Sequence, residues 1–336
     1  MMDAIQPDVR VAAIIPHWNR ADLLQSMLAH LPSQTRRFDR VIVVDNGSTD
    51  NSVDIAERAG AHVIQLERNQ GFAAAVNRGV AAAAGFDWLS ILNNDVTLEP
   101  EWLECLMHAA TAANASFATG KTLSASDHSC IDGLWDEISR GACPLRCGAG
   151  ALDDARWNRP RQIRMASMTA SLFRRELFQE LGPLDGRFES YLEDVDFGLR
   201  CAKASRCGVY EPSAVAYHQG SATMGRWQAR TVQLLSRNQV LLAVKHFRGQ
   251  RFWPMLAGQL LWGLVALRHR CGWAWVRGKF AARSASSEIP NETYDAAAFA
   301  AILRASEAEI LSIQRQADGK IRDRYWRLYA WLAPLR

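Results

Sequence analysis

Polar side chains stand at three points of this sequence where an apolar, strand-like run ends. Asp45 closes one run, Asp95 follows a second, and His218 closes a third. Open α/β sheets bind their ligands at the carboxyl ends of strands, so we expect these residues at one ligand-binding edge. Carboxylates at such an edge can hold a metal-bound diphosphate or take a proton from a nucleophile. The pattern therefore predicts a metal-assisted group transfer from a nucleotide donor.

Each strand-end carboxylate also has a structural interpretation. Asp45 can accept a hydrogen bond from the N–H of uracil or thymine or from a ribose hydroxyl, but the Asp-Asn-Gly-Ser run that it begins also suits an ordinary turn. Asp95 follows Asn93 and Asn94 and suits Mg²⁺ or Mn²⁺ bound together with phosphate oxygens. Its alternative is an Asx turn that precedes a helix starting near Pro100. The sequence alone leaves these alternatives open.

An acidic segment begins a predicted helix further along the chain. If Glu193 opens this helix, Asp194 lies in the first turn, where the helix dipole favours the ionised carboxylate. Asp196 and Arg200 are four residues apart and can pair, which indicates a structural role for Asp196. Asp194 then remains available as a general base, although acids are also common in the first turn of any helix. His218 is likewise consistent with a structural histidine.

Alternating strand and helix patterns position these residues. Short apolar runs predict strands, and apolar residues at helical spacing predict the helices between them. The predicted strands are 11–16, 40–45, 62–66, 88–92, 163–173 and 209–217, and the predicted helices are 21–31, 48–58, 71–84, 175–181 and 192–204. Residues 120–160 lose this periodicity and are expected to form loops. The alternation predicts an α/β fold with a doubly wound, mostly parallel sheet.

Composition indicates a globular, intracellular protein. Apolar residues make up 49% and charged residues 22% of the chain, which suits a sizeable core. The first ten residues contain no apolar signal-peptide core. The seven cysteines are scattered and fit reduced thiols, with a zinc site built from Cys143, Cys147, Cys201 and Cys207 as the alternative. A cytoplasmic location is the expectation.

The C-terminal third has a different character. From Arg230 onward helical patterning dominates, so we expect a boundary near residue 225. No acidic residue occurs between Glu211 and Glu288, whereas eleven Lys or Arg lie between Arg226 and Arg283. Such asymmetry predicts an anionic partner.

Several tryptophans are interleaved with these cations. The combination suits helices that lie on an anionic membrane surface, with a homo-oligomer interface as the alternative. The apolar segment from Phe252 to Leu267 is too short to span a bilayer and contains Pro254 and Gln259. No nucleic-acid-binding module is recognisable, so no nucleic acid partner is expected.

Together the polar clusters resemble glycosyltransferase family 2, the inverting enzymes of the GT-A fold, and within it the rhamnosyltransferase-like bacterial members. Seven motifs occur in the order of that family, over about residues 11–225. They are Ile15-Pro16-His17-Trp18-Asn19; Val43-Val44-Asp45-Asn46-Gly47-Ser48-Thr49-Asp50; Asn69-Gln70-Gly71-Phe72-Ala73 with Asn77; Leu92-Asn93-Asn94-Asp95; Leu181-Gly182-Pro183-Leu184-Asp185-Gly186-Arg187-Phe188; Glu193-Asp194-Val195-Asp196-Phe197-Gly198-Leu199-Arg200; and Ala216-Tyr217-His218.

The resemblance implies a GT-A catalytic domain over residues 8–225, built on a mixed sheet with helices on both faces, and a helical region over 226–336. It implies a dTDP-, UDP- or GDP-linked sugar as donor, with rhamnose as one candidate sugar. The residues implied in binding its nucleotide are Pro16, Asn19, Asp45, Asn46, Ser48, Asn69, Gly71, Asn77, Asn93 and Asn94.

The resemblance also implies roles in the reaction. Asp95 and His218 resemble ligands of Mg²⁺ or Mn²⁺, although Asn93 and Asn94 replace the first carboxylate of an Asp-x-Asp motif. Asp194 resembles the base that deprotonates the acceptor hydroxyl, and Glu193 and Asp196 are expected to support it. The implied acceptor is a polyprenyl-linked or surface glycan of the cell envelope. The enzyme is then expected to lie peripherally on the inner face of the membrane.

An oxidoreductase and a non-catalytic glycan-binding protein are the two alternative functions. A nicotinamide-dependent sugar-nucleotide oxidoreductase needs a glycine-rich turn after its first strand, and the residues from Pro16 to Asn19 contain no glycine. A non-catalytic glycan-binding protein does not need Asp95, Asp194 and His218 together. The sequence therefore favours the glycosyltransferase.

Overall fold

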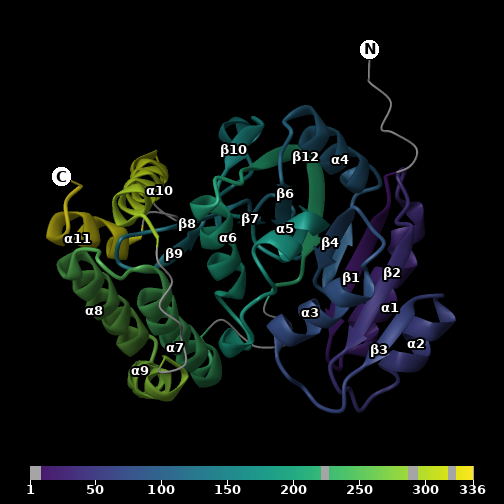
Figure 1. Cartoon of the computed structure of the whole chain (residues 1–336), viewed down its shortest axis with the longest axis horizontal. Coiled ribbons are helices and arrows are strands. Elements are labelled where there is room, and N and C mark those ends of the chain that lie inside the picture. Colours follow the sequence, from purple (N-terminus) through teal and green to yellow (C-terminus); the bar gives the residue numbers. More distant parts are fainter. Residues whose placement is uncertain (1–8, 221–226, 287–293, 317–322, 336) are drawn as a thin grey trace.

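The computed structural model describes residues 9–220, 227–286, 294–316 and 323–335. A central sheet with its helices forms one side of the molecule, and a group of C-terminal helices forms the other (Figure 1). The predicted boundary between residues 225 and 226 lies outside the described residues, as does most of the N-terminal stretch without a signal-peptide core.

The N-terminal half of the sheet is parallel. Its strands lie in the order β3-β2-β1-β4 and are joined by helices, as the alternating pattern predicts. The strands are β1 (Val11–His17), β2 (Arg40–Asp45), β3 (His62–Gln65) and β4 (Trp88–Leu92), and the helices are α1 (Ala21–His30), α2 (Ser52–Arg58) and α3 (Phe72–Ala82). The predicted ranges agree with these bounds to within a few residues. All four strands end at the same edge, because parallel strands share a direction.

The second half of the sheet is largely antiparallel, which makes the whole sheet mixed. Strand β11 runs antiparallel to both of its neighbours, β4 and β6, and β12 then runs parallel to β6. Two short strands pair with β12 and one with β6, all antiparallel. These strands are β5 (Val96–Leu98), β6 (Phe117–Ser124), β7 (Ile131–Gly133), β10 (Arg161–Ile163), β11 (Ala170–Arg174) and β12 (Gly208–His218). The mostly parallel sheet expected from the pattern is thus wrong for this half.

Helices cover both faces of the sheet because alternate strand residues point to opposite sides. On β1, Ile14 belongs to one buried cluster and Ile15 to the other. Helices α3, α5 and α6 contribute to the first cluster, and α1 and α4 to the second. The other helices around the sheet are α4 (Trp102–Ala112), α5 (Arg175–Glu180) and α6 (Glu193–Lys203). Short 3-10 turns are η1 (Leu31–Ser33), η2 (Ala155–Trp157) and η3 (Gly186–Phe188). The doubly wound arrangement is confirmed.

The middle of the chain departs most from the sequence prediction. Residues 120–160 are not only loops, because β6, β7 and a hairpin of β8 (Asp136–Ile138) and β9 (Pro144–Arg146) lie there. The sequence pattern does not predict β6, because Gly120 and Lys121 interrupt its run of apolar residues. Lys121 is buried against Asp153, at 2.6 Å, and a side chain at Gly120 would collide with the carbonyl of Ala214. The single strand predicted over 163–173 is two strands, β10 and β11.

The C-terminal third is helical, as predicted. Its helices are α7 (Ala229–His246), α8 (Phe252–Arg268), α9 (Gly272–Ser286), α10 (Ala296–Gln316) and α11 (Arg324–Leu332). One buried cluster combines Val195 and Leu199 of α6 with Leu241 of α7 and Phe299 of α10. Within the described residues, no helix is long and apolar enough to cross a bilayer. The first helix of this region therefore shares its core with the helix that carries the acidic motif.

Candidate active site

Asp45 ends β2 with a buried carboxylate that is only half satisfied. Its Oδ2 accepts a hydrogen bond from the backbone N–H of Ser48 at 3.1 Å, which forms the predicted turn. Its Oδ1 is buried and has no hydrogen-bond partner within the described residues. Buried polar atoms are nearly always paired, so an unpaired acceptor at a strand end indicates a ligand that donates. The turn and the binding interpretation of Asp45 are compatible, because each uses a different oxygen.

The amide side chains near Asp45 mainly hold the loops that surround it. Asn46 donates to Asn69 Oδ1 at 3.1 Å and to the carbonyl of Gly71 at 3.0 Å. Gly71 has φ +90°, and a Cβ there would lie 2.6 Å from the carbonyl oxygen of Glu189. Only glycine fits this close approach. The donor-side loop after β3 is thereby fixed against the loop that leads to the acidic helix.

A second set of contacts joins the loops after β1 and β2. The backbone N–H of Asn19 donates to Ser48 Oγ at 2.7 Å, and the N–H of Thr49 donates to Asn19 Oδ1 at 2.9 Å. Pro16 is a fully buried residue of β1 paired with Val44. These contacts place Pro16, Asn19 and Ser48 around Asp45.

Two residues predicted to bind the donor also make hydrogen bonds that hold the backbone of neighbouring segments. The amide of Asn77 both donates to and accepts from the backbone of Leu184, at 2.9 Å each way. The backbone N–H of Asn93 donates to the carbonyl of Thr169 at 2.8 Å, which ties the end of β4 to the approach to β11. Asn77 therefore supports the loop before the acidic motif rather than facing the Asp45 cluster.

His17 is a site residue that the sequence analysis did not select. Its Nδ1 lies 2.8 Å from Asn94 Nδ2, and its Nε2 lies 2.7 Å from Ser52 Oγ, which in turn bonds to Asp50. Burial lowers the pKa of His17 to about 4, so the ring is neutral and accepts from Asn94 while donating to Ser52. The ring links the end of β1 to the start of α2 and to the residues after β4. Its place inside the Pro16–Asn19 motif, at the end of a buried strand, was the available signal.

Asp95 and His218 meet at the opposite side of the β4 end. His218 Nε2 lies 3.2 Å from Asp95 Oδ1, and His218 Nδ1 lies 2.8 Å from Asp132 Oδ2. Burial works against a charged ring, but the hydrogen bonds that the ring donates to Asp132 and Asp95 outweigh it and raise the pKa of His218 to about 9. The sequence predicted the first pair and missed Asp132, because that residue lies in the segment without periodicity.

The Asp95–His218 pair fits a hard divalent cation whose other ligands would come from the sugar donor and from water. Two ligands at about 2.1 Å from one ion, at right angles, are about 3.0 Å apart, close to the Asp95–His218 separation. Asp132 on Nδ1 fixes the ring so that Nε2 can face an ion. Among the described residues, no three or more His, Cys, Asp or Glu form a metal-binding group, and this includes the cysteines considered for zinc. Mg²⁺ commonly takes one or two carboxylates and completes its shell with phosphate oxygens and water.

The acidic motif begins α6, as predicted. Asp194 Oδ1 accepts a hydrogen bond from the N–H of Val195 at 2.8 Å, and its Oδ2 lies 3.7 Å from Arg146 Nη2. Tyr191 and Leu192, directly before the helix, both have positive φ angles, 72° and 68°. Such strained backbone clusters at functional sites and aims the first turn of the helix. Asp194 is thus a carboxylate with little direct pairing, at a positive helix end.

Glu193 and Asp136 are buried carboxyl groups that interact with the charge of Asp194. Burial, followed by the charge of Asp194, raises the pKa of Glu193 well above its ordinary value, and Glu193 Oε2 has no partner within the described residues. Burial also raises the pKa of Asp136, which lies 3.3 Å from Arg146. Arg146 is therefore the cation shared by the carboxylates here, and the sequence analysis did not select it.

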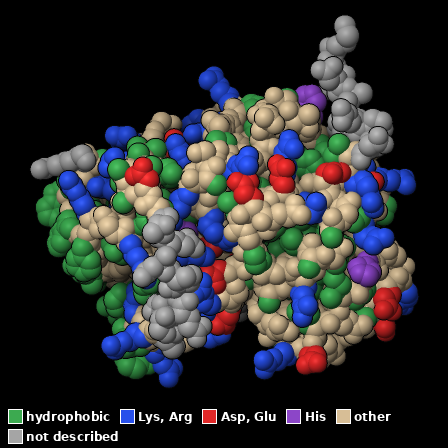
Figure 2. All heavy atoms as spheres, in the orientation of Figure 1, with side chains coloured by type: hydrophobic (Ala, Val, Ile, Leu, Met, Phe, Trp, Pro, Cys, Tyr) green, Lys and Arg blue, Asp and Glu red, His purple; other side chains and the backbone are tan. Residues whose placement is uncertain are grey.

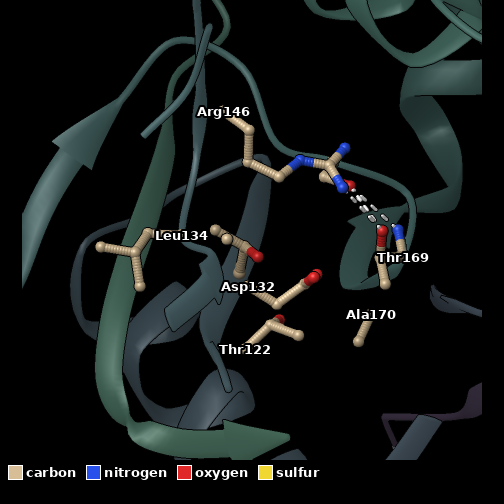
Figure 3. Close-up of a pocket in the computed structure, with 9 residues that line it drawn as sticks. Thr122, Asp132, Leu134, Arg146, Thr169 and Ala170 are labelled. Atoms are coloured by element: carbon tan, nitrogen blue, oxygen red, sulfur yellow. Dashed lines mark hydrogen bonds between the residues drawn. The ribbon is translucent and has the colours of Figure 1, made fainter. Parts of the chain in front are cut away.

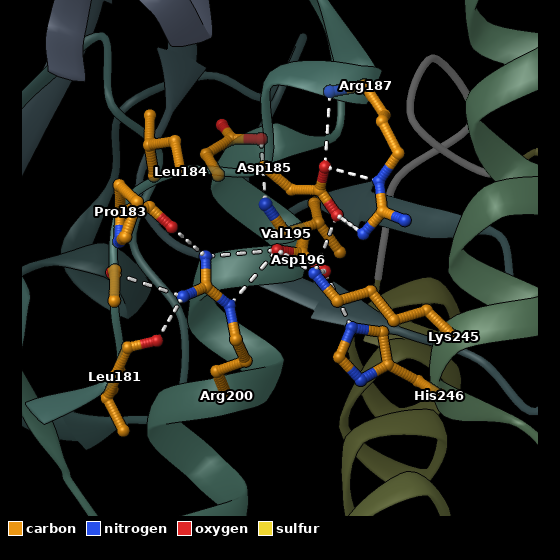
Figure 4. A network of polar contacts seen from close by, with 12 residues as sticks. Leu181, Pro183, Leu184, Asp185, Arg187, Val195, Asp196, Arg200, Lys245 and His246 are labelled. Carbon is orange, nitrogen blue, oxygen red and sulfur yellow. Dashed lines mark hydrogen bonds and ion pairs between the residues drawn. The ribbon is translucent and has the colours of Figure 1, made fainter. Parts of the chain in front are cut away.

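Asp196 is buried in a network of cations (Figure 4). It contacts Arg200 of its own helix at 3.1 Å, and Lys245 and His246 of α7 at 2.8 and 2.7 Å. Burial alone would raise its pKa, but the His246 hydrogen bond and the neighbouring cations hold it far below its ordinary value. Lys245 also contacts Asp185 at 2.9 Å. The Arg200 pair was predicted, whereas the contacts to α7 required the tertiary structure.

A small cavity is lined by residues that contact His218 and Asp194 (Figure 3). Asp132 and Arg146 line it together with Thr169, whose Oγ1 lies 3.3 Å from Arg146 Nη1. Its volume of about 10 Å³ admits roughly one water molecule and no sugar. The cavity shows that Asp132, the partner of His218, and Arg146, the partner of Asp194, are neighbours. The partners of His218 and of Asp194 therefore line one cavity.

Comparisons with known proteins agree with this geometry. Residues 12–182 match the family described as Glycosyl transferase family 2. An N-acetylglucosaminyl-diphospho-decaprenol L-rhamnosyltransferase of Mycobacterium tuberculosis is 28% identical over 272 residues, which are 73% of this chain and 87% of that protein. A PGL/p-HBAD biosynthesis glycosyltransferase of Mycobacterium bovis is 32% identical over 193 residues, 56% of this chain and 68% of the relative.

One solved structure shares the fold. The crystal structure of GalNAc-T7 with UDP, GalNAc and Mn²⁺ superposes with a TM-score of 0.60 at 12% sequence identity. The match covers 85% of this chain but only 59% of that one. At this identity the likeness supports the fold alone, and it confirms the GT-A expectation.

Proposed function

The chain belongs to glycosyl transferase family 2 and is a glycosyltransferase, and on that premise we propose that it moves a sugar from a nucleoside diphosphate to a hydroxyl of a lipid-linked glycan, with inversion at the anomeric carbon. The observation that carries the proposal is the position of Asp194. Its carboxylate lies in the first turn of α6 near Arg146, and Arg146 lines the same small cavity as Asp132, the partner of His218. The proposed base and the proposed diphosphate-binding pair thus have partners that line one cavity, which supports the proposal.

On the donor side, the unpaired Oδ1 of Asp45 accepts the N–H of the nucleobase. Asn19 and Ser48 hold the loop around it, and the Asn46–Asn69 pair holds the next loop. This arrangement favours uracil or thymine, because each has one N–H on the edge that faces an acceptor. Their hydrogen bond to a buried carboxylate is charge-assisted and stronger than one between neutral groups.

Asp95 and His218 would hold Mg²⁺ or Mn²⁺ at the donor diphosphate, where the ion supplies Lewis-acid stabilisation of the departing charge. Asp132 keeps the imidazole oriented for this role. Asp194 takes the proton of the acceptor hydroxyl, whose oxygen attacks the anomeric carbon from the face opposite the nucleoside diphosphate. Arg146 offsets the negative charge around Asp194, and the raised pKa of buried Glu193 disfavours a second charge beside it.

The relatives guide the choice of substrates. N-acetylglucosaminyl-diphospho-decaprenol and L-rhamnose appear in the name of one relative, and a second is named for PGL/p-HBAD biosynthesis. We take rhamnose as the first sugar to test and a polyprenyl-diphosphate glycan as the first acceptor. Such an acceptor places the enzyme on the inner face of a membrane. The exposed apolar residues of α8 and α11, including Leu264 and Trp331, support that contact, and a homo-oligomer interface is the alternative.

The test is a panel of nucleotide sugars offered to the purified chain with polyprenyl-linked acceptors. We expect release of the nucleoside diphosphate with one donor and formation of a glycosylated lipid. The Asp194→Asn variant serves as the catalytic control. If no donor is turned over while Asp194→Asn binds the same nucleotide as the wild type, the proposed transfer reaction is wrong and only nucleotide binding remains.

A further inference from the structure

A second cavity lies in the helical region, beside the turn of the β8–β9 hairpin. Its volume is about 310 Å³, and it is lined by Arg140 after β8, by the first turn of α8 at Arg251 and Pro254, and by α10 at Ala300 and Arg304. No carboxylate is among the lining residues. The proposed transfer reaction leaves this cavity unused.

The cavity carries an excess of positive charge. The guanidinium groups of Arg251 and Arg304 have no hydrogen-bond or ion-pair partner among the described residues. Arg140 is held by Glu307 through two nitrogens, so this pair adds little net charge. Asp295 is occupied as the cap of α10, where it accepts from two backbone N–H groups. The guanidinium groups of Arg251 and Arg304 therefore supply the excess.

The start of α8 adds to this field. The backbone of Arg251 forms the N-cap of α8, and no side chain caps the helix there. Helix α8 has 17 residues, so its positive end carries the full dipole of a long helix. Free N–H groups at such an end favour phosphate. Guanidinium groups and a helix end thus act on the same space.

An apolar stripe lies directly beside the cavity. Trp253, Leu260, Leu264 and Leu267 recur on one side of α8, and each is more than half exposed. Trp253 Nε1 donates to the carbonyl of Leu332 at 2.8 Å, which joins the stripe to the end of α11, where Trp331 is 77% exposed. Figure 2 shows hydrophobic side chains gathered at the left edge of the molecule, where Figure 1 places α8.

The cavity sits at the rim of this stripe rather than in its middle. Pro254 follows Trp253 by one residue, which is a rotation of roughly 100° around the helix. Arg140 connects the two features, because its Nη2 also donates to the carbonyls of Ala333 and Pro334 after α11. Apolar side chains with cations at their rim match the layering of a bilayer, whose phosphates lie above the acyl chains.

We propose that the cavity between α8 and α10 binds the phosphate of an anionic phospholipid, while the apolar stripe of α8 and α11 enters the same leaflet. This inference rests on the proposed membrane contact and adds a specific site to it. The site is separate from the metal pair and the base, so lipid binding does not require the sugar donor.

The test measures binding of the purified full chain to sedimented vesicles of phosphatidylcholine with graded phosphatidylglycerol. We expect Arg251→Ala with Arg304→Ala to lower the affinity for anionic vesicles by about 30-fold, from roughly 1 kcal/mol for each cation. Arg68→Ala with Arg78→Ala removes two exposed cations of the N-terminal half and should leave binding unchanged. Equal losses in the two double variants would overturn the specific site, since net charge would then explain the effect.

Two further arms separate the sources of phosphate and the two proposals. Calorimetry with inorganic phosphate alone should show weak binding at most. The lipid is not the ligand if phosphate binds tightly and Arg251→Ala/Arg304→Ala loses this binding but still binds vesicles. Trp331→Ser should reduce binding to neutral and anionic vesicles alike. If the wild-type chain binds neither vesicle, the membrane contact fails together with the site. Turnover of a water-soluble acceptor would show that the transfer reaction stands.

Discussion

The two sides of the active site are held in different ways. Around Asp45, the donor side is built from neutral hydrogen bonds between neighbouring loops, with one unpaired carboxylate oxygen. Around Asp194, the other side is built from buried charges that are balanced by Arg146 and, through Asp196, by α7. The first side depends mainly on contacts among the loops after β1, β2 and β3, whereas the second depends on Arg146 and on the C-terminal helices. Binding and proton transfer should therefore fail separately.

The largest expected effect comes from Asp194→Asn, which removes the proposed proton acceptor on the charged side. Turnover should fall by about 10²–10⁴, while donor affinity measured by calorimetry stays close to that of the wild type. Glu193→Gln is the matched control, because Glu193 is buried and its pKa is raised, so an amide replaces a neutral acid. Wild-type turnover in purified Asp194→Asn would remove Asp194 from the mechanism.

Asp196→Ala should cost about 3–5 kcal/mol of unfolding free energy, because Lys245 and its neighbours would keep a buried, unbalanced charge. Denaturant titration measures this loss. Glu180→Ala breaks the exposed pair with Arg206 instead and should cost no more than about 1 kcal/mol. A similar small cost for both variants would mean that α7 is not anchored through Asp196.

Asp132→Ala should weaken Mn²⁺-dependent donor binding by about 10–100-fold, since His218 loses the partner that orients it. Donor binding in EDTA should not change. Asp132→Asn keeps a hydrogen-bond acceptor and should recover part of the loss. Calorimetry with and without Mn²⁺ measures the donor affinity of each variant. Equal donor affinity of the wild type in the two conditions would refute the metal role of Asp95 and His218.

Asp45→Asn tests the neutral side. It removes the charge from the oxygen proposed to accept the nucleobase N–H, so KM for the donor should rise by about tenfold with a smaller change in kcat. Asp54→Asn, an exposed change on α2, is the control and should leave both constants as they are. A fall in kcat without a change in KM would place Asp45 outside the donor site.

The smallest effect expected is a change of pH dependence in Glu193→Gln. Burial raises the pKa of Glu193 in the folded chain, so its protonated form contributes stability that is complete below pH 4.5 and declines as the pH rises towards the folded pKa. The glutamine variant lacks this decline, so its unfolding free energy should depend less on pH above 4.5. Parallel pH profiles for the two proteins would show that Glu193 is ionised in both states.

The sequence by itself determined the parallel half of the sheet, the start of α6 and the positions of Asp45, Asp95, Asp194 and His218. These features follow from periodicity and from motifs within single segments, which act over a few residues. The sequence also predicted the Asp196–Arg200 pair, because residues four apart on a helix are neighbours.

Only the tertiary structure decided which partners those residues have. Asp132 and Arg146 come from a segment of short strands without a period of its own, and their roles arise from contacts with His218 and Asp194 across large sequence separations. Lys245 pairs with Asp196 for the same reason, after a separation of 49 residues. Local sequence patterns do not predict such pairs, because a charge buried on one element is balanced by whichever element the fold packs against it.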